Sequence, residues 1–229
     1  MPTIVDEEFG AITVRRSTRA TQVRLRVAPD GTLRASMPVY APLFLLKRLV
    51  KSSRPQLRKM LQQAQPDVTY SDGQQIGKSH TLIVKRGAKI AATRNKQRIV
   101  VTLPEGTPLS DPTAVRAIRD ASLVALRVEA KSYLPKRLQY LADQLGFRYE
   151  KVRFSHASSR WGSCSSTGTI SLNIALMKLP FELIDYVIVH ELAHTVEMNH
   201  SQAFWSLVEK GDPQYKQHRK LLKQEAPSI

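Results

Sequence analysis

The segment 190–194 constrains this chain more than any other, because it places two imidazoles and a carboxylate within one turn of an apolar run. Residues four apart share a face of a helix, so His190 and His194 can bind one ion while Glu191 reaches a water beside it. Apolar residues recur at three- and four-residue spacing over 183–189, which predicts a helix that buries the histidine face. This pattern is typical of a zinc hydrolase.

A catalytic zinc ion usually takes three protein ligands and leaves one position to water, so a third ligand is needed. His200 is the best candidate, because it follows His194 by six residues, beyond a helix end that we expect at Asn199. Glu197 is nearer, three residues after His194 on the same predicted helix. We expect its carboxylate to support one of the ligands by a hydrogen bond rather than to bind the ion itself. The remoter alternatives are Glu209 and His218.

Two core histidines bonded to backbone carbonyls are the alternative to a metal site. Burying two unligated rings beside a carboxylate is costly unless every polar atom finds a partner, and one ion satisfies all of them together. We therefore predict one zinc ion per chain, with Glu191 as the general base toward water. A non-enzymatic, zinc-stabilised nucleic-acid-binding module is disfavoured, because structural zinc sites usually use several cysteines and only Cys164 is present.

The positive charge of the chain is concentrated ahead of this motif. The formal net charge is +16, and residues 1–110 hold 19 Lys and Arg against 7 Asp and Glu. Residues 111–229 hold 16 against 12. DNA or another polyanion is a natural partner for the basic first half, and a contribution to solubility is the alternative explanation.

The sequence also bears on the compartment. No apolar run approaches the roughly 20 residues of a membrane span, and the N-terminal residues lack the pattern of a signal peptide. A single cysteine cannot form an internal disulfide, which fits a reducing environment. We expect a cytoplasmic protein without membrane contact.

The first part of the chain alternates strand and helix patterns. Residues 11–38 predict a β-hairpin around Pro29-Asp30-Gly31, with apolar residues on one face and arginines on the other. Residues 43–65 predict an amphipathic helix that Pro55 kinks or divides.

A second block repeats this plan. Short strands are predicted over 81–84, 90–93 and 98–103. A helix capped by Asp111 should follow, break at Pro135 and resume as far as Gly146. Strands over 152–155 and 169–173 then precede the metal helix, which should start at Pro180.

These elements predict an α+β protein. We expect a basic, β-rich, helix-flanked N-terminal region over 1–110 and a zincin-like domain over 111–229. In the second domain the active-site helix should pack on a small antiparallel sheet.

Further strings accompany the metal motif. They are Arg160–Cys164, Gly168–Asn173, Ile184–His194, Asn199–Ser201 and Phe204-Trp205, with Arg16–Arg19 near the N-terminus. Together they resemble the YgjP-like metal-dependent hydrolases, which are relatives of the SprT-like and WLM-type zinc metalloproteases. The resemblance implies that His190, His194 and His200 are zinc ligands and that Glu191 is the catalytic base.

The resemblance leaves two substrate classes open. Relatives include proteases that act on DNA-associated proteins, which favours a metallopeptidase with a peptide substrate. The alternative is a nucleotide pyrophosphohydrolase that cleaves phosphoanhydrides of nucleoside triphosphates on the same metal site. The histidine spacing also matches the metzincins, but Glu197 stands where that class has a glycine and no Met-turn follows, which argues against that class.

A few other residues invite a functional reading. Arg160 and His156 lie in a loop that can face the zinc and bind an anionic group, or else cap strands. Cys164 is more simply a small buried hydrophobe than a nucleophile. Three aromatic residues near the motif are read as core rather than as base-stacking groups: Trp161, Phe204 and Trp205.

Overall fold

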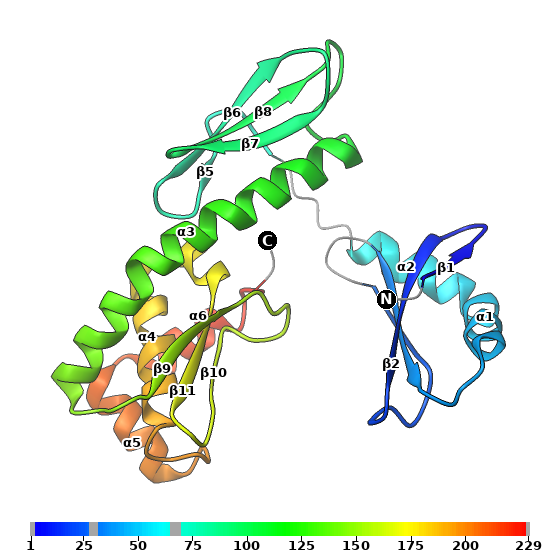
Figure 1. Ribbon diagram of the computed structural model, residues 1–229. Coiled ribbons are helices and arrows are strands. Elements are labelled where there is room, and N and C mark those ends of the chain that lie inside the picture. The colour runs from blue at the N-terminus through cyan, green and yellow to red at the C-terminus, as the bar shows by residue number, and fades with distance from the viewer. Residues whose placement is uncertain (1–2, 28–31, 65–69, 228–229) are drawn as a thin grey trace. The chain divides into compact units, whose positions relative to one another are not determined.

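The computed structural model describes residues 3–27, 32–64 and 70–227 (Figure 1). The chain divides into two compact units, residues 1–68 (unit 1) and 69–229 (unit 2). The boundary that the sequence predicts after residue 110 falls within unit 2 and remains a prediction. The fold is α+β, as predicted. No helix within the described ranges is long and apolar enough to cross a membrane.

Unit 1 is a four-stranded sheet with two helices on one face. The strands are β1 (Thr3–Asp6), β2 (Gly10–Ser17), β3 (Arg24–Val27) and β4 (Leu33–Pro38), in the order β1-β2-β4-β3. β2 and β4 are parallel, and the other neighbours are antiparallel. The antiparallel β3–β4 pair confirms the later part of the hairpin predicted over 11–38, but residues 11–17 belong to the separate strand β2, which is parallel to β4. The predicted turn at 29–31 lies outside the described residues.

The helices of unit 1 are α1 (Leu43–Ser52) and α2 (Arg54–Ala64). The chain leaves the helical path at Ser53, two residues before Pro55, which confirms the predicted division. The apolar side chains of the sheet's inner face and of the two helices form one core: Ile12, Val14, Leu33, Ala35, Met37, Leu46, Val50 and Leu57. The period-two alternation of the strands therefore leaves the opposite face of the sheet to solvent.

Unit 2 begins with a second four-stranded sheet, which packs on a long helix. The strands are β5 (Gln75–Ile76), β6 (His80–Arg86), β7 (Ala91–Asn95) and β8 (Arg98–Leu103), in the order β5-β6-β8-β7. The three longer strands confirm the sequence prediction. The helix α3 (Pro112–Leu145) contacts β7 and β8, and Figure 1 shows it running from this sheet to the rest of unit 2.

Both ends of α3 follow the sequence signals, but its middle does not. The carboxylate of Asp111 accepts hydrogen bonds from the backbone N–H groups of Thr113 and Ala114, and Gly146 ends the helix at a φ of 74°. The predicted break at Pro135 is wrong, because the helix continues through it. An interior proline costs about 3 kcal/mol, and burial of Leu134 and of Leu138 each contributes roughly 1.5–3 kcal/mol when the helix stays intact.

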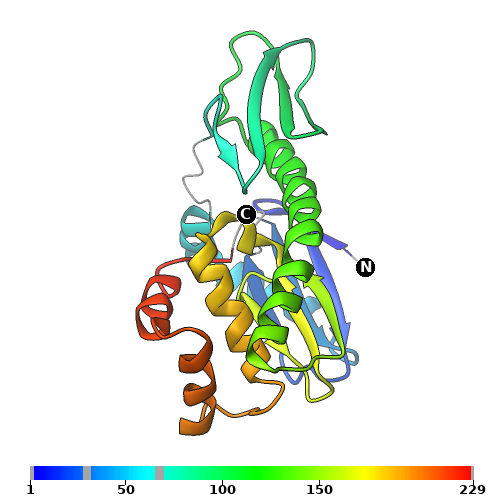
Figure 2. The same ribbon diagram turned by 90° about the vertical axis from the view of Figure 1, so that its left-hand side faces the viewer.

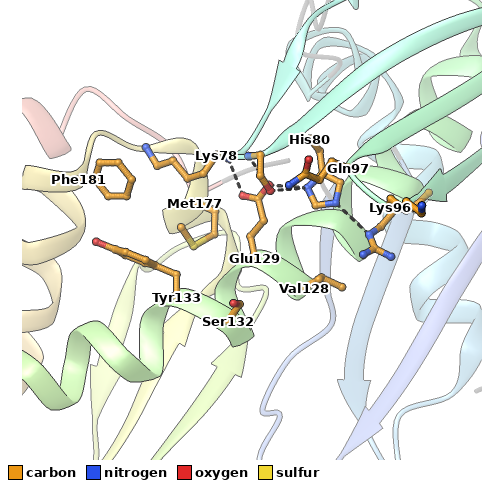
Figure 3. A pocket seen from close by; sticks show the side chains of 12 residues that line it. Lys78, His80, Lys96, Gln97, Val128, Glu129, Ser132, Tyr133, Met177 and Phe181 are labelled. Carbon is orange, nitrogen blue, oxygen red and sulfur yellow. Dashed lines mark hydrogen bonds and ion pairs between the residues drawn. The ribbon is translucent and has the colours of Figure 1, made fainter.

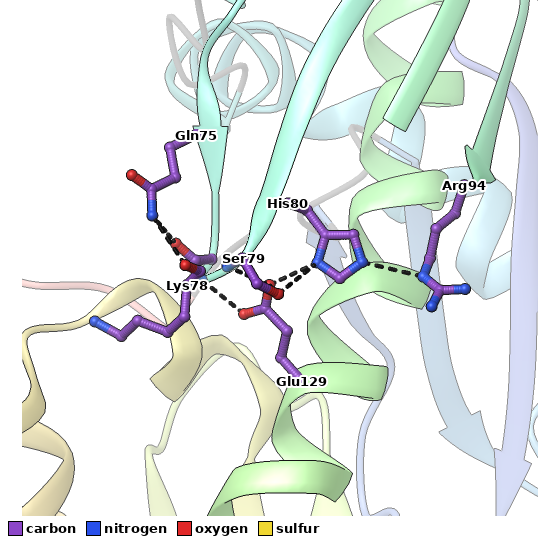
Figure 4. A network of polar contacts seen from close by, with 7 residues as sticks. Gln75, Lys78, Ser79, His80, Arg94 and Glu129 are labelled. Atoms are coloured by element: carbon purple, nitrogen blue, oxygen red, sulfur yellow. Dashed lines mark hydrogen bonds and ion pairs between the residues drawn. The ribbon is translucent and has the colours of Figure 1, made fainter. Parts of the chain in front are cut away.

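A buried polar network joins α3 to the turn between β5 and β6 (Figure 4). The carboxylate of Glu129 accepts hydrogen bonds from the backbone N–H groups of Lys78 (2.7 Å) and Ser79 (2.8 Å) and lies 2.6 Å from Nδ1 of His80. Nε2 of His80 accepts from Nε of Arg94, so Nδ1 carries the proton and donates to Glu129. Gly77 has a φ of +70°, and a Cβ there would lie 2.4 Å from Oε2 of Glu129, so only glycine allows this approach.

The last part of unit 2 contains a small sheet and three α-helices. The strands are β9 (Lys151–Ser155), β10 (Gly162–Cys164) and β11 (Thr169–Asn173), in the order β10-β11-β9. β10 and β11 are antiparallel but β11 and β9 are parallel, so the sheet is mixed and not antiparallel as predicted. Parallel neighbours need a long crossover, and the connection 156–168 supplies one and contributes β10 on the way.

The remaining helical elements follow that sheet. They are the 3₁₀ turn η1 (Ile174–Lys178) and the helices α4 (Phe181–Ala193), α5 (Gln202–Gly211) and α6 (Tyr215–Leu222). Figures 1 and 2 show α4 beside the lower part of α3. The guanidinium of Arg137 on α3 makes two hydrogen bonds of 2.7 Å to the carboxylate of Asp185 on α4. This pair and the shared apolar core fix α4, the helix that carries the histidine motif.

Candidate metal centre

Helix α4 presents the motif from a buried position. It begins directly after Pro180, as predicted, and most of its apolar residues from Leu183 to Ala193 are buried. The expected end at Asn199 is wrong, because the helix ends at Ala193 with His194 as its cap. The backbone N–H groups of residues 195–197 bond to the carbonyls of Leu192 and Ala193, which tightens the last turn and directs the chain away.

Three imidazoles converge beyond this helix end. Nε2 of His200 lies 3.2 Å from Nε2 of His190, and the candidate ligand nitrogens of His190, His194 and His200 all lie within 4.8 Å of one another. Tetrahedral ligands at 2.0–2.1 Å from one zinc ion are about 3.3 Å apart. Among the described residues this is the only group of three or more metal-ligating side chains, and its His200 side is exposed to solvent.

The surroundings of the three rings fit a bound cation. Oε2 of Glu191 is buried without a hydrogen-bond partner among the described groups, so the carboxylate beside the three rings lacks the polar neighbour that a buried oxygen normally has. Burial, with the neighbouring His194 and His200, lowers the pKa of His190 to about 3, so the ring is neutral and offers a lone pair. Three imidazole nitrogens beside a carboxylate are a ligand set that suits zinc.

A backbone carbonyl orients one of these rings. Nδ1 of His194 lies 3.0 Å from the carbonyl oxygen of Glu197, to which it can donate, and this bond leaves Nε2 of the ring free. Glu197 was predicted to support a ligand from the same helix. The structure places it in the following turn, where its main chain and not its carboxylate makes the contact.

Aromatic residues of α5 and α6 position His200. Its ring stacks on Trp205 at 5.6 Å between centroids, and Trp205 also stacks on Tyr215 at 5.4 Å. The guanidinium carbon of Arg219 lies 4.6 Å from the centroid of Trp205. Phe204 is fully buried beside the histidines, with centroid distances of 4.5 Å to His194 and 4.7 Å to His200. Two of the aromatic residues that the sequence assigns to the core, Phe204 and Trp205, therefore also hold the rings.

Glu191 lies between the helix and the edge of the small sheet. Its side chain is 5% exposed, and this burial raises its pKa to about 8, against a smaller lowering by the charge of Arg160. A Cβ at Gly162 on β10 would lie 2.6 Å from Oε1 of Glu191. Gly162 therefore allows β10 to approach the carboxylate closely.

The other sequence candidates lie apart from the cluster. Partial burial and the charges of Arg119 and Arg127 on α3 lower the pKa of His156, and no described contact joins it to the three rings. Nδ1 of His218 is bonded instead to Asp212 at 2.7 Å. Burial and the nearby carboxylate of Glu191 raise the pKa of Cys164, which supports its reading as an inert thiol.

Sequence reasoning missed Gly162, Tyr215 and Arg219. A glycine that opens a strand often marks a close approach of two backbones or of a backbone and a side chain, so Gly162 carried a usable signal. Tyr215 and Arg219 lie on a short helix far from the motif in the sequence, and no local pattern links them to His200.

A separate cavity of about 540 Å³ lies at the opposite end of α4 (Figure 3). Its lining includes Lys96 on one side and Phe181 on the other, where Nζ of Lys78 lies 4.3 Å from the centroid of the Phe181 ring. Phe181 precedes His190 by nine residues, which is about 14 Å along a helix. The cavity therefore does not contain the histidine cluster.

Comparison with known proteins adds the following. The sequence profile of the YgjP-like metallopeptidase domain matches residues 21–225. The metallopeptidase zymogen of Pyrococcus abyssi abylysin is 30% identical over 39% of this chain and 91% of that chain, with a TM-score of 0.37. The metallopeptidase zymogen of Methanocaldococcus jannaschii jannalysin is 20% identical over 39% of this chain and 93% of that chain, with a TM-score of 0.35. No curated protein matches the sequence.

Proposed function

This chain belongs to the YgjP-like metallopeptidase family, and from that premise we propose that it is a zinc-dependent peptidase with one zinc ion per chain. In this proposal His190, His194 and His200 hold the ion and Glu191 is the general base. The convergence of the three imidazoles beside a buried carboxylate is the observation that carries the proposal.

The residues of the site have defined tasks in peptide hydrolysis. A zinc ion held by the three imidazoles would supply Lewis acidity, which polarises the peptide carbonyl and makes a water more acidic. Glu191 accepts a proton from the water as its oxygen attacks the carbonyl carbon. The protonated side chain of Glu191 then passes this proton to the amide nitrogen as the C–N bond breaks, which releases the two peptide products with a new carboxyl group and a new amine. Burial raises the pKa of Glu191 while the site holds no ion, and a cation on the three imidazoles would lower that pKa again, which favours the carboxylate form that accepts the proton.

The sheet edge next to Glu191 favours a peptide as substrate. β10 is an edge strand that pairs only with β11 among the described strands, so the backbone groups on its other side can pair with an extended peptide. Gly162 places this edge against Glu191, which would bring the scissile bond of such a peptide toward the general base.

The nucleotide pyrophosphohydrolase remains the second candidate, because two cations lie close to the site. The charge of Arg160 acts on Glu191, and that of Arg219 acts on His190. Such cations can bind either a phosphate or a carboxylate of a peptide.

A substrate panel separates the two candidates. The full-length, zinc-loaded protein is incubated with fluorogenic peptides and casein, and in parallel with nucleoside triphosphates while phosphate and pyrophosphate release are recorded. We expect chelator-sensitive peptide cleavage and no phosphate or pyrophosphate release. Phosphate or pyrophosphate release without proteolysis would replace the peptidase by the nucleotide hydrolase.

A cytoplasmic location, inferred from the single cysteine, is also part of the proposal. Fractionation of cells that contain the protein tests it.

A further inference from the structure

The outer face of the unit 1 sheet carries a group of arginines that the metal centre does not use. Residues paired across neighbouring strands point to the same side of a sheet, so the pairing register shows which residues share a face. The side chains opposite the core are Arg15 on β2, Arg24 and Arg26 on β3, and Arg34 on β4, and all four are exposed. We call this group the arginine face.

The register sets these arginines in two adjacent rows. Arg26 pairs with Arg34, which pairs in turn with Thr13. In the next row Arg24 and Arg15 flank Ser36. Neighbouring strands are about 4.8 Å apart and residues two apart along a strand about 6.7 Å, so the four side chains start within an area roughly 10 Å by 7 Å.

Three of the four cations on this face have no acidic partner among the described residues. Among the described acidic residues of the unit, Asp6 and Glu8 pair with Arg54, and Glu8 pairs also with Arg58. These acids therefore form ion pairs with α2, which lies on the other side of the sheet. The described residues include no acidic partner for Arg15, Arg24 or Arg26.

The register also places two of these cations directly opposite each other. Like charges directly opposite each other on neighbouring strands are destabilising, and Arg26 and Arg34 are such a pair. An anionic partner would remove this repulsion. The net charge of unit 2 is positive as well, since residues 69–229 hold 23 Lys and Arg against 14 Asp and Glu.

The side chains between the arginines indicate the kind of anion. Thr13 and Ser36 are small and polar, and no aromatic residue lies in either row, so the face offers no platform for stacking bases. The exposed aromatic residues of unit 1, Tyr40 and Phe44, lie instead beside and in α1. A membrane surface would usually also require apolar side chains for insertion, which these rows lack. A flat array of cations without stacking groups fits the dense phosphates of a double helix.

We propose that the arginine face binds the phosphate backbone of double-helical nucleic acid, independently of its sequence. This inference stands apart from the proposed peptidase site, because none of its residues belongs to unit 2. With three to four phosphate contacts, the logarithm of the association constant should fall with the logarithm of salt concentration at a slope of about −3.

Anisotropy of a fluorescent DNA duplex, titrated with the full-length protein at several salt concentrations, tests the proposal. We expect the triple variant Arg15→Gln, Arg24→Gln, Arg26→Gln to bind roughly 10- to 100-fold more weakly at low salt, with a slope reduced by about 2 to 3. Unchanged duplex affinity in this variant overturns the proposal. The melting temperature should stay equal or rise, since a like-charge pair is relieved. The matching Arg→Lys triple variant, which keeps the charge, should bind within a few-fold of the wild type, and an equally large loss there also overturns the proposal.

A control variant removes the same charge from the helical side of unit 1. Lys47, Arg48 and Lys51 are exposed on α1, and changing all three to Gln should alter duplex affinity by less than about threefold. An equal loss in this control would mean that only net charge matters, which overturns the proposal. Tighter binding to a single strand of the same sequence overturns it too. So does binding to phosphatidylserine vesicles without binding to the duplex.

Discussion

The substitution Gly162→Ala tests how closely β10 approaches the proposed general base. The new methyl carbon would lie 2.6 Å from Oε1, 2.7 Å from Cγ and 2.8 Å from Cδ of Glu191. Carbon atoms in good contact are at least 3.5 Å apart, so the side chain must move by roughly 0.8 Å. Because Glu191 is 5% exposed, it has little open space into which to move.

We expect this displacement to affect catalysis more than metal binding. A misplacement of about 1 Å at a reacting group lowers rates by about 100-fold, which is about 2.7 kcal/mol of transition-state stabilisation. Overpacking should also lower the free energy of unfolding by about 1–3 kcal/mol. The assay is kcat/KM on a fluorogenic peptide, with zinc content measured on the same samples. Zinc content should stay at one ion per chain, since the methyl group meets none of the three histidines.

Gly211→Ala is the matched control. Its Cβ would lie 2.7 Å from Cδ1 of Leu145 and 2.8 Å from Cγ1 of Val189, so it overpacks against α4 without meeting Glu191. This variant should lose a similar amount of stability and keep kcat/KM within about threefold. The reasoning is refuted if Gly162→Ala retains full activity, or if Gly211→Ala loses as much activity as Gly162→Ala.

Three further predictions concern the base, the third histidine and the buried network. Glu191→Gln should keep zinc and lower kcat by about 10²- to 10⁴-fold, and retained turnover at full zinc content would contradict its role. Trp205→Ala should weaken zinc affinity by about 10- to 100-fold in a chelator competition, because His200 loses its stacking partner, and unchanged affinity would contradict this. Burial alone would raise the pKa of Glu129, but hydrogen bonds from Lys78, Ser79 and His80 together outweigh it and hold this pKa below its ordinary value. The carboxylate therefore stabilises the folded protein at neutral pH, and this contribution is lost as the pH falls through the lowered pKa. Glu129→Gln should therefore lower the unfolding free energy by about 1–3 kcal/mol at pH 7 and reduce the acid sensitivity of thermal melts, and parallel pH profiles for both proteins would refute it.

Elements whose signals are local were predictable from the sequence. The cap at Asp111, the left-handed end at Gly146 and the alternating strands β4 and β8 each depend on a few neighbouring residues. Pro135 shows where local reasoning fails, because burial of the surrounding leucines along α3 overrides the intrinsic preference of proline. The parallel pairing of β9 with β11 could not be predicted either, because the pairing of distant strands leaves little trace in the sequence.

The metal centre also contains some residues that local sequence predicts and others that depend on tertiary contacts. His190 and His194 share a helix face by periodicity alone, and the sequence pattern was enough to pair them. The placement of His200 depends on a stack built from α5 and α6, which is a tertiary contact. The contact from Glu197 uses a carbonyl oxygen, and side-chain chemistry gives no hint of it.

Zinc K-edge X-ray absorption on the full-length, stoichiometrically loaded protein tests the metal assignment most directly. The account predicts three imidazole nitrogens at about 2.0–2.1 Å and one oxygen from solvent. A sulfur ligand at about 2.3 Å, a fourth ligand from the protein, or a spectrum unchanged by His200→Ala would contradict it.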